Sequence, residues 1–479
     1  MKPILLSNTS YTTAKKIIPY LKSIRFWLAF FFVIRLVGIT NPPLEKGHDW
    51  RQCLTNMMSR NLYEVDNNPM YPRVDNGGKH NGIIASEFPV FNYMVYLVSI
   101  PFGYAHWYGR LINLILSTIA SWYFYKLLKL YFDESIAFNA TMLLTLSIWF
   151  GFSRKSMPDT FSMSLMILAF YQVFKFTKTN TWWRLALYGL LAATSILAKL
   201  PALFSLSILL LPCLSKNIAY LPKASIVLAS ICVFSIMYWW YFVWGGYLLK
   251  TWEYQLFFPK NYKEGPKEFL PYIDKAFEQF YFSAFQSFAG FGMFLLGLFY
   301  CFKNKIWLPL QILLVSFPVF VIFIVMSGNV FAIHSYYIIP FVPVMALIAG
   351  AGLRYLPAKI YPWILVLISL ESLANQHNDF FIKDSEKFKM NLEAEINRHI
   401  PKGEKVAMAG TTGPQYLYFA HRRGWGLSPE QTLDTAYMNF VQTKGYRYLI
   451  VVKQELNSQP GYKLVGEERD IFIYDMSAK

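Results

Sequence analysis

Long apolar stretches separated by short polar segments run through most of the chain, up to about residue 375. Most of these stretches are about 17 to 25 residues long, which is the length of an α-helix that crosses the hydrocarbon core of a bilayer. We expect helices at about 24–40, 109–130, 135–152, 160–176, 184–213 (two helices), 223–246, 286–302, 306–327, 338–353 and 360–375. The pattern therefore predicts an α-helical polytopic membrane protein with about eleven transmembrane helices.

Lysines and arginines at the ends of the apolar stretches orient the helices, because short cytoplasmic loops are enriched in both residues. The N-terminal stretch is basic and apolar but lacks a small-residue cleavage site, so we expect an uncleaved first transmembrane helix. If the apolar segment 90–104 also crossed the membrane, each later basic cluster would change sides. We therefore expect this segment to lie as an amphipathic helix at the outer interface.

With this orientation, the segments 41–108 and 247–285 and the last hundred residues lie on the outer side. The C-terminal part has the composition of soluble protein, with short β-like runs at 405–409, 448–452 and 471–474. We therefore expect a transmembrane domain at 1–376, which includes both outer segments, and a small extracytoplasmic α/β domain at 377–479. The topology indicates a multi-pass protein of the cytoplasmic membrane.

Composition excludes several other classes of protein. Hydrophobic residues make up 55% of the chain, charged residues 15%, and the mean hydropathy is +0.31, which is far too apolar for a soluble protein. The net charge of +17 is divided among short clusters between apolar stretches, so it indicates membrane anchoring and no nucleic acid partner. The chain shows no Walker loop, no Asp-x-Asp element and no zinc-like His/Cys spacing, so we expect no cofactor and no metal site.

Ionisable and aromatic residues recur in the outer segments, near the membrane boundary. Near its start, the first outer segment contains Gly47-His48-Asp49-Trp50-Arg51-Gln52. An acid and a guanidinium this close to a bilayer must be hydrated, form an ion pair or take part in function. Similar residues follow at the ends of later helices: Glu87, Arg154, Asp159, Lys199, His334, Tyr336 and Tyr337. Convergence on one outer cavity is the economical explanation, and it would join catalytic carboxylates to phosphate-binding cations.

Each of these residues also has a plainer structural role that the sequence leaves open. Acids suit the first turn of a helix, where the helix dipole favours negative charge: Glu87 and Asp159. Basic residues suit interfacial salt bridges or lipid headgroups: Arg51 beside Asp49, Arg154 and Lys199. Aromatic residues and histidine suit the membrane–water interface: Trp50, His334, Tyr336 and Tyr337.

Five motifs, taken in chain order, resemble bacterial glycosyltransferases of the GT-C fold. They are Gly47-His48-Asp49-Trp50-Arg51-Gln52, Tyr71-Pro72-Arg73-Val74-Asp75, Glu87-Phe88-Pro89, Ser153-Arg154 with Met157-Pro158-Asp159, and Lys199-Leu200-Pro201. The chain is similar over residues 24–375 to the protein O-mannosyltransferases and to the aminoarabinose transferases of lipid A. One difference is that protein mannosyltransferases carry paired acids in the first loop, whereas Asp49 is followed by Trp50.

The resemblance implies sugar transfer from a polyprenyl-phosphate donor to a lipid, glycan or protein acceptor on the outer face of the membrane. It also implies roles for single residues. The expected catalytic acids are Asp49, as general base, and Asp159. The expected ligands of the donor phosphate are Arg51, Arg154 and Lys199. The expected substrate-binding residues are His48, Glu87, His334, Tyr336 and Tyr337.

This chemistry is coherent in physical terms. A carboxylate near an arginine stays ionised and accepts the acceptor's proton as the bond to phosphate breaks. One base with a departing phosphate predicts inversion at the anomeric carbon. The alternatives are a transporter or flippase of lipid-linked sugars and an envelope scaffold protein. Transporters place ionisable groups near the middle of the membrane, often in repeated halves, and neither feature is visible here, so we favour the enzyme.

Overall fold

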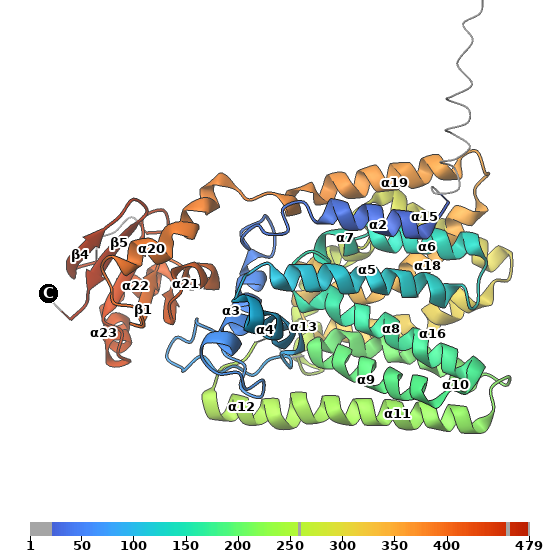
Figure 1. Cartoon of the computed structure of the whole chain (residues 1–479), viewed down its shortest axis with the longest axis horizontal. Helices are drawn as coiled ribbons and strands as arrows, with labels where there is room; N and C mark the ends of the chain where they lie inside the picture. The colour runs from blue at the N-terminus through green and yellow to red at the C-terminus, as the bar shows by residue number, and fades with distance from the viewer. Residues whose placement is uncertain (1–21, 257–259, 457–459, 478–479) are drawn as a thin grey trace, which may run out of the picture.

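A computed structural model describes residues 22–256, 260–456 and 460–477. Long helices run together along its longest axis, and a smaller α/β domain lies at one end (Figure 1). The long helices are α2 (Ile24–Arg35), α5 (Tyr108–Leu128), α6 (Glu134–Leu146), α8 (Pro158–Thr179), α9 (Trp182–Ala198), α11 (Tyr220–Tyr238), α15 (Phe288–Lys303), α16 (Trp307–Met326), α18 (Val342–Tyr355) and α19 (Tyr361–Gln376). Shorter segments join them: α7 (Trp149–Phe152), η1 (Leu200–Leu209), α10 (Leu210–Leu214), η2 (Trp239–Trp244), α12 (Gly245–Trp252), α13 (Glu264–Phe269), η3 (Leu270–Tyr272), α14 (Ile273–Glu278), η4 (Gln279–Ser283), α17 (Val330–Ile333) and η5 (Ser335–Phe341).

Four helical stretches in the described part of the chain are long and apolar enough to cross a membrane: Tyr108–Leu128, Tyr220–Trp252, Trp307–Met326 and Ser335–Tyr355. The pair Glu264–Ser283 and Phe288–Lys303, bent by 88°, gives a fifth if it is counted as one span. Large apolar side chains on the outside of the bundle are 63% to 74% exposed, as at Leu228, Leu314, Ile322 and Trp363. Such a surface suits lipid. The chain is an integral multi-pass membrane protein.

Length and apolar composition identify four or five of the roughly eleven spans that the sequence predicts. The helix expected at 24–40 is α2, with 12 residues. The helix expected at 135–152 breaks between α6 and α7, where the Ile148 amide bonds to the Ala284 carbonyl at 3.1 Å. Polar side chains such as Ser162 are buried between helices, and they lower the hydropathy of segments that pack inside the bundle.

The stretch formed by η5 and α18 lies at the centre of the bundle, since 94% of its apolar window is buried. Helices α15 and α18 approach closely at two glycines. A Cβ atom on Gly297 would lie 1.9 Å from the Ile348 carbonyl oxygen, and one on Gly352 would lie 2.2 Å from that of Met293. Small residues at these positions therefore permit the backbone contact that membrane helices use for packing.

The C-terminal domain contains a five-stranded sheet in the order β2-β1-β3-β5-β4. Its strands are β1 (Val406–Ala409), β2 (Gly424–Leu427), β3 (Tyr448–Val452), β4 (Lys463–Glu467) and β5 (Ile471–Asp475). Strands β2, β1 and β3 are parallel, whereas β5 and β4 are antiparallel to their neighbours. Its helices are η6 (His377–Phe380), η7 (Asp384–Asn391), α20 (Leu392–Asn397), α21 (Pro414–Ala420), α22 (Pro429–Leu433) and α23 (Thr435–Thr443). The expected α/β domain and its three predicted strands are present, and β2 and β4 are additional.

The segment 41–108, called the first outer segment because the topology predicts it outside, lies between the bundle and this domain, where it forms α3 (Asp49–Glu64) and α4 (Val90–Phe102) (Figure 1). Apolar side chains of α3, such as Leu54 and Met57, share one hydrophobic core with Met408 and Ile450 of the sheet. Helix α19 ends at Gln376, next to the predicted domain boundary. The core nevertheless crosses that boundary, so α3 and the C-terminal domain are packed as one unit.

Candidate functional site

A cavity of about 220 Å³, which we call the polar cavity, joins the first outer segment to the ends of several bundle helices. Six residues predicted from the sequence line it: Arg51, Glu87, Lys199, His334, Tyr336 and Tyr337. The remaining lining residues are Trp50, Ser86, Leu200, Pro201, Tyr241, Leu256, Phe323 and Val330. Residues from distant loops thus converge on one site, whereas His48, Asp49, Arg154 and Asp159 do not line it.

Hydrogen bonds between helices place the polar groups of the cavity. The hydroxyl of Ser162 in α8 donates to the Ser195 carbonyl in α9, and the Ser195 hydroxyl donates to the Ser162 carbonyl, each at 2.7 Å. This pair aligns the start of α8 with the end of α9, where Lys199 follows. The Trp240 indole donates to the Ser86 carbonyl at 3.0 Å and so holds the backbone beside Glu87.

The Glu87 carboxylate lies between two cations. It pairs with the Arg51 guanidinium and lies 3.5 Å from the Lys199 ammonium, whose nitrogen is also 3.8 Å from Asp159 Oδ1. Glu87 is the most exposed of the four side chains, at 15%. Asp159 does not line the cavity, and its Oδ2 is buried with no hydrogen-bond partner among the described residues.

These charges control the protonation of their neighbours. Burial alone would raise the pKa of Glu87, but the charges of Arg51 and Lys199 outweigh it and lower the pKa to about 2. Burial, with the charge of Lys155, lowers the pKa of His48 to about 2. Burial, with the charges of Lys199 and Arg51, also lowers the pKa of His334. At neutral pH, Glu87 is therefore ionised and both imidazoles are neutral.

Aromatic rings form one wall of the site. The His334 ring stacks on Tyr336 with ring centroids 5.3 Å apart, and Tyr336 lies 4.7 Å from Tyr337. His48 joins them, with its centroid 5.1 Å from Tyr336 and 5.0 Å from that of Phe152. His48 has a φ of 63°, a left-handed conformation that a residue other than glycine adopts only when its surroundings enforce it.

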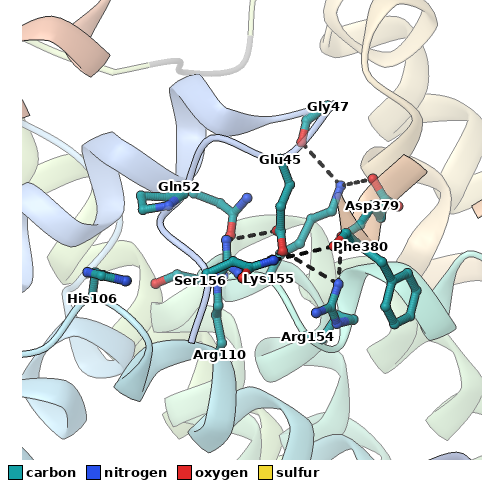
Figure 2. Close-up of polar contacts among 12 residues, drawn as sticks. Glu45, Gly47, Gln52, His106, Arg110, Arg154, Lys155, Ser156, Asp379 and Phe380 are labelled. Carbon is teal, nitrogen blue, oxygen red and sulfur yellow. Dashed lines mark hydrogen bonds and ion pairs between the residues drawn. The ribbon is translucent and has the colours of Figure 1, made fainter. Parts of the chain in front are cut away.

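A group of five charged side chains, the buried charge cluster, holds this turn: Glu45, Arg110, Arg154 and Lys155 are buried, and the Asp379 side chain is 17% exposed. Figure 2 shows the Lys155 side chain reaching from the α7–α8 loop to Gly47 and Asp379. Its ammonium donates to the Gly47 carbonyl at 3.3 Å and to Asp379 Oδ1 at 2.8 Å. Arg110 pairs with Glu45 at 2.8 Å, and both side chains are fully buried. The turn before α3 is therefore held both to the bundle and to η6, at the start of the C-terminal domain.

Arg154 belongs to this cluster, and the structure does not bring it to the polar cavity. Its guanidinium donates to the backbone carbonyls of Arg35, Val37 and Asp379, and its side chain is fully buried. It also stacks on Phe380 at 3.9 Å (Figure 2). Burial lowers the pKa of Arg154 to about 10, although Glu45 acts in the opposite direction. All three guanidinium nitrogens of Arg154 donate within the protein, and Arg154 lies outside the polar cavity, so it is not placed to bind a phosphate there.

Asp49, the predicted base, is the first residue of α3 and faces the C-terminal domain. Its Oδ2 accepts a hydrogen bond from Gln415 Nε2 at 3.1 Å. Asp49 is partly exposed and does not line the polar cavity, but the two residues that follow it, Trp50 and Arg51, do. The contact with Gln415 was missed from the sequence because the two residues are 366 positions apart and no motif links them.

A larger cavity of about 520 Å³ lies between α5, α8, α10, α16 and α18. Among the described residues that line it there is no Asp, Glu, His, Lys or Arg, so it offers no acid–base chemistry. The described ranges of the chain also contain no group of three or more His, Cys, Asp or Glu that could hold a metal ion. The polar cavity is therefore the best candidate site.

Comparison with known proteins supports the expected fold. Residues 86–240 match the family model described as dolichyl-phosphate-mannose-protein mannosyltransferase. ArnT from Cupriavidus metallidurans in the apo state superposes with a TM-score of 0.63 at 10% identity, covering 94% of this chain and 97% of that chain. The same protein bound to undecaprenyl phosphate has a TM-score of 0.60 at 11% identity, with the same coverage of 94% and 97%.

An archaeal oligosaccharyltransferase, AglB from Archaeoglobus fulgidus in complex with an inhibitory peptide and a dolichol-phosphate, has a TM-score of 0.52 at 12% identity. The match covers 89% of this chain and 69% of that chain. None of the curated protein sequences compared with the chain matches it. The resemblance inferred from the five motifs is confirmed, and the fold is ArnT-like.

The ion pairs of Glu87 lead to a prediction about stability. Glu87→Gln leaves Arg51 and Lys199 buried without their shared carboxylate, which we expect to cost about 3 kcal/mol of unfolding free energy at neutral pH. Because the folded pKa of Glu87 is depressed from 4.5 to about 2, the wild-type advantage is complete above pH 4.5 and disappears as pH falls through about 2. Thermal unfolding of both proteins in detergent as a function of pH measures this difference.

The matched control is Glu253→Gln, which removes a carboxylate whose side chain is 70% exposed and whose lysine partner is 3.4 Å away. We expect little change in stability there. Equal stability of the two variants at neutral pH would contradict the role given to Glu87.

Proposed function

We propose that this chain, a membrane glycosyltransferase of the GT-C fold that depends on a polyprenyl-phosphate sugar, transfers that sugar to an acceptor hydroxyl on the outer face of the cytoplasmic membrane. The acceptor is a lipid, a glycan or a protein. The observation that carries the proposal is the convergence of Arg51 and Lys199 on one cavity that is also lined by Trp50, the neighbour of the partly exposed Asp49.

Arg51 and Lys199 bind the donor phosphate in this proposal. Cationic donors stabilise the charge that develops on a departing phosphate, and they are most effective in a site that excludes water. Glu87 and Asp159 balance the two cations in the absence of donor, so the phosphate competes with Glu87 for them. The ArnT structure with undecaprenyl phosphate supports a lipid phosphate as ligand of this fold.

Asp49 is the general base, because an acceptor from outside can reach it. It is partly exposed at the junction with the C-terminal domain, whereas Asp159 is only 5% exposed and lies beside Lys199. Asp49 takes the proton of the acceptor hydroxyl as that oxygen attacks the anomeric carbon. Asp159 orients Lys199, and His48, His334, Tyr336 and Tyr337 form the wall against which the sugar binds.

The charge distribution of the bundle supports the orientation in the membrane. Basic residues gather at the ends of α5, α8, α15 and α18 that lie away from the C-terminal domain (Figure 1): Lys126, Lys129, Lys178, Lys303 and Arg354. Loops at this end are in contact, since Lys178 donates to the Leu130 carbonyl at 2.6 Å and Arg354 lies 3.9 Å from Asp133. Positive charge favours the cytoplasmic side, so the polar cavity and the C-terminal domain face outward.

The position of the charged groups also favours an enzyme over a flippase of lipid-linked sugars. A flippase needs its polar groups along a path near the middle of the membrane. Glu87, Arg51 and Lys199 instead meet at the end of the bundle, next to the loops that lead into α3 and α4. A site at one face of the membrane suits transfer of the sugar to an acceptor on that face, whereas a flippase must move its substrate across the membrane.

The assignment of the base is tested by sugar transfer with purified protein in detergent and a panel of polyprenyl-phosphate sugars, supplied with extracted membrane lipids and glycans as acceptors. We expect Asp49→Asn to reduce the rate at least about 100-fold, since a lost general base typically costs that much, with undecaprenyl phosphate binding retained. Asp66→Asn, an exposed aspartate of the same outer segment, is the control and should behave as wild type. If Asp159→Asn abolished transfer while Asp49→Asn remained active, Asp159 would be the base.

The stereochemistry of the product is a second test. One base and a departing phosphate predict a single displacement, so we expect inversion at the anomeric carbon. Nuclear magnetic resonance of the product, compared with a donor of known configuration, gives the result. Retention would require a covalent intermediate or a second displacement and would contradict the mechanism.

A further inference from the structure

We propose that Gln415 of the C-terminal domain is a positioning residue for Asp49, so that this domain orients the base of the transfer reaction. The inference rests on the proposed role of Asp49. It gives the C-terminal domain a part in catalysis that no motif in its sequence indicates.

The contact joins the first residue of α3 to the second residue of α21. Gln415 Nε2 donates to Asp49 Oδ2 at 3.1 Å. Among the described residues, no other hydrogen bond to the Asp49 side chain is found. The amide therefore holds one carboxylate oxygen and leaves Oδ1 for the proton of an acceptor.

The loop before α21 has the shape that this contact requires. A Cβ atom on Gly413 would lie only 2.4 Å from Gln415 Oε1, so a glycine at this position makes room for the amide group. The Gly413 amide donates to Thr411 Oγ1 at 3.1 Å, which fixes the loop that follows β1. Gln415 Oε1 is buried and has no hydrogen-bond partner within the described residues. The amide is thus directed at Asp49 by packing as well as by its one hydrogen bond.

Helix α21 is also held against α3 at a second point. Arg60 Nη1 donates to the Tyr418 carbonyl at 3.0 Å, and the guanidinium lies 4.7 Å from the centre of the Tyr418 ring. The Tyr418 hydroxyl is 3.0 Å from that of Tyr104. Because these contacts fix the position of α21, Gln415 has little freedom to move away from Asp49.

The chemical consequence follows from the charge on the carboxylate. During transfer, the acceptor oxygen forms a bond to the anomeric carbon, the bond from that carbon to phosphate oxygen breaks, and the leaving phosphate keeps the electron pair. The acceptor's proton passes to Asp49 Oδ1. The Gln415 N–H stabilises the ionised carboxylate before this step, and it keeps the free oxygen aimed at the acceptor.

Two substitutions at Gln415 separate hydrogen bonding from shape. Gln415→Glu has nearly the same shape, but its ionised side chain donates no hydrogen bond and places a negative charge beside Asp49. Gln415→Ala removes both the shape and the donor. We expect Gln415→Ala to lower the single-turnover rate about 10-fold at neutral pH, and Gln415→Glu to lower it further because like charges repel.

The readout is the single-turnover rate as a function of pH, with the polyprenyl-phosphate sugar that wild type consumes. We expect the acidic limb of the profile to move to higher pH in both variants, more so for Gln415→Glu. Binding of undecaprenyl phosphate should be unchanged. Gly413→Ala, which displaces the amide without altering Gln415 itself, should move the limb in the same direction.

The control is Gln442→Ala in α23, where Nε2 also donates one hydrogen bond, to the Met476 carbonyl at 3.1 Å. We expect Gln442→Ala to show the same dependence of single-turnover rate on pH as wild type. The proposal is overturned if Gln415→Glu matches or exceeds wild type, or if its profile coincides with that of Gln442→Ala, while Asp49→Asn is inactive. Activity in Asp49→Asn would instead refute the proposed base itself.

Discussion

The carboxylate of Glu87 lies between Arg51 and Lys199, and the arrangement of the polar cavity depends on it. Two cations that are almost completely buried remain in place only if a negative charge compensates for their lost hydration. The three residues come from the first turn of α3, the segment before α4 and the end of α9. These three residues therefore come together only if the first outer segment is correctly positioned on the end of the bundle. The hydrogen bonds between Ser162 of α8 and Ser195 of α9 help to fix that end.

The turn that precedes α3 is the second constraint. Gly47 and His48 have φ values of 88° and 63°, and for His48 this conformation costs of the order of 1 kcal/mol. Lys155 holds the Gly47 carbonyl, and its own charge is compensated by Asp379 at the entrance to the C-terminal domain (Figure 2). The buried charge cluster thus holds one turn that positions two residues: His48 lies against the aromatic wall, and Asp49 lies opposite Gln415.

Much of the site could be predicted because charged residues at helix ends must meet a partner or water. The expected topology places Arg51, Glu87 and Lys199 on the same side of the membrane, and buried charges of opposite sign must pair. Arg154 could not be placed in this way, since its partners are backbone carbonyls that leave no trace in the sequence. The partner of Asp49 depends on how α21 packs on α3, and the edge strand β4 has too little buried apolar surface to be recognised. Length and apolar composition identify only four or five of the expected spans in the described part of the chain, because buried serines make several bundle helices less apolar.

The most direct test of the account is the position of a lipid phosphate in the protein. Electron cryomicroscopy of the wild-type protein with undecaprenyl phosphate would locate it. We expect the phosphate oxygens within about 3 Å of both the Arg51 guanidinium and the Lys199 ammonium, with Glu87 displaced from at least one of them. A phosphate bound elsewhere, with both ion pairs of Glu87 unchanged, would contradict the assignment of the polar cavity as the donor site.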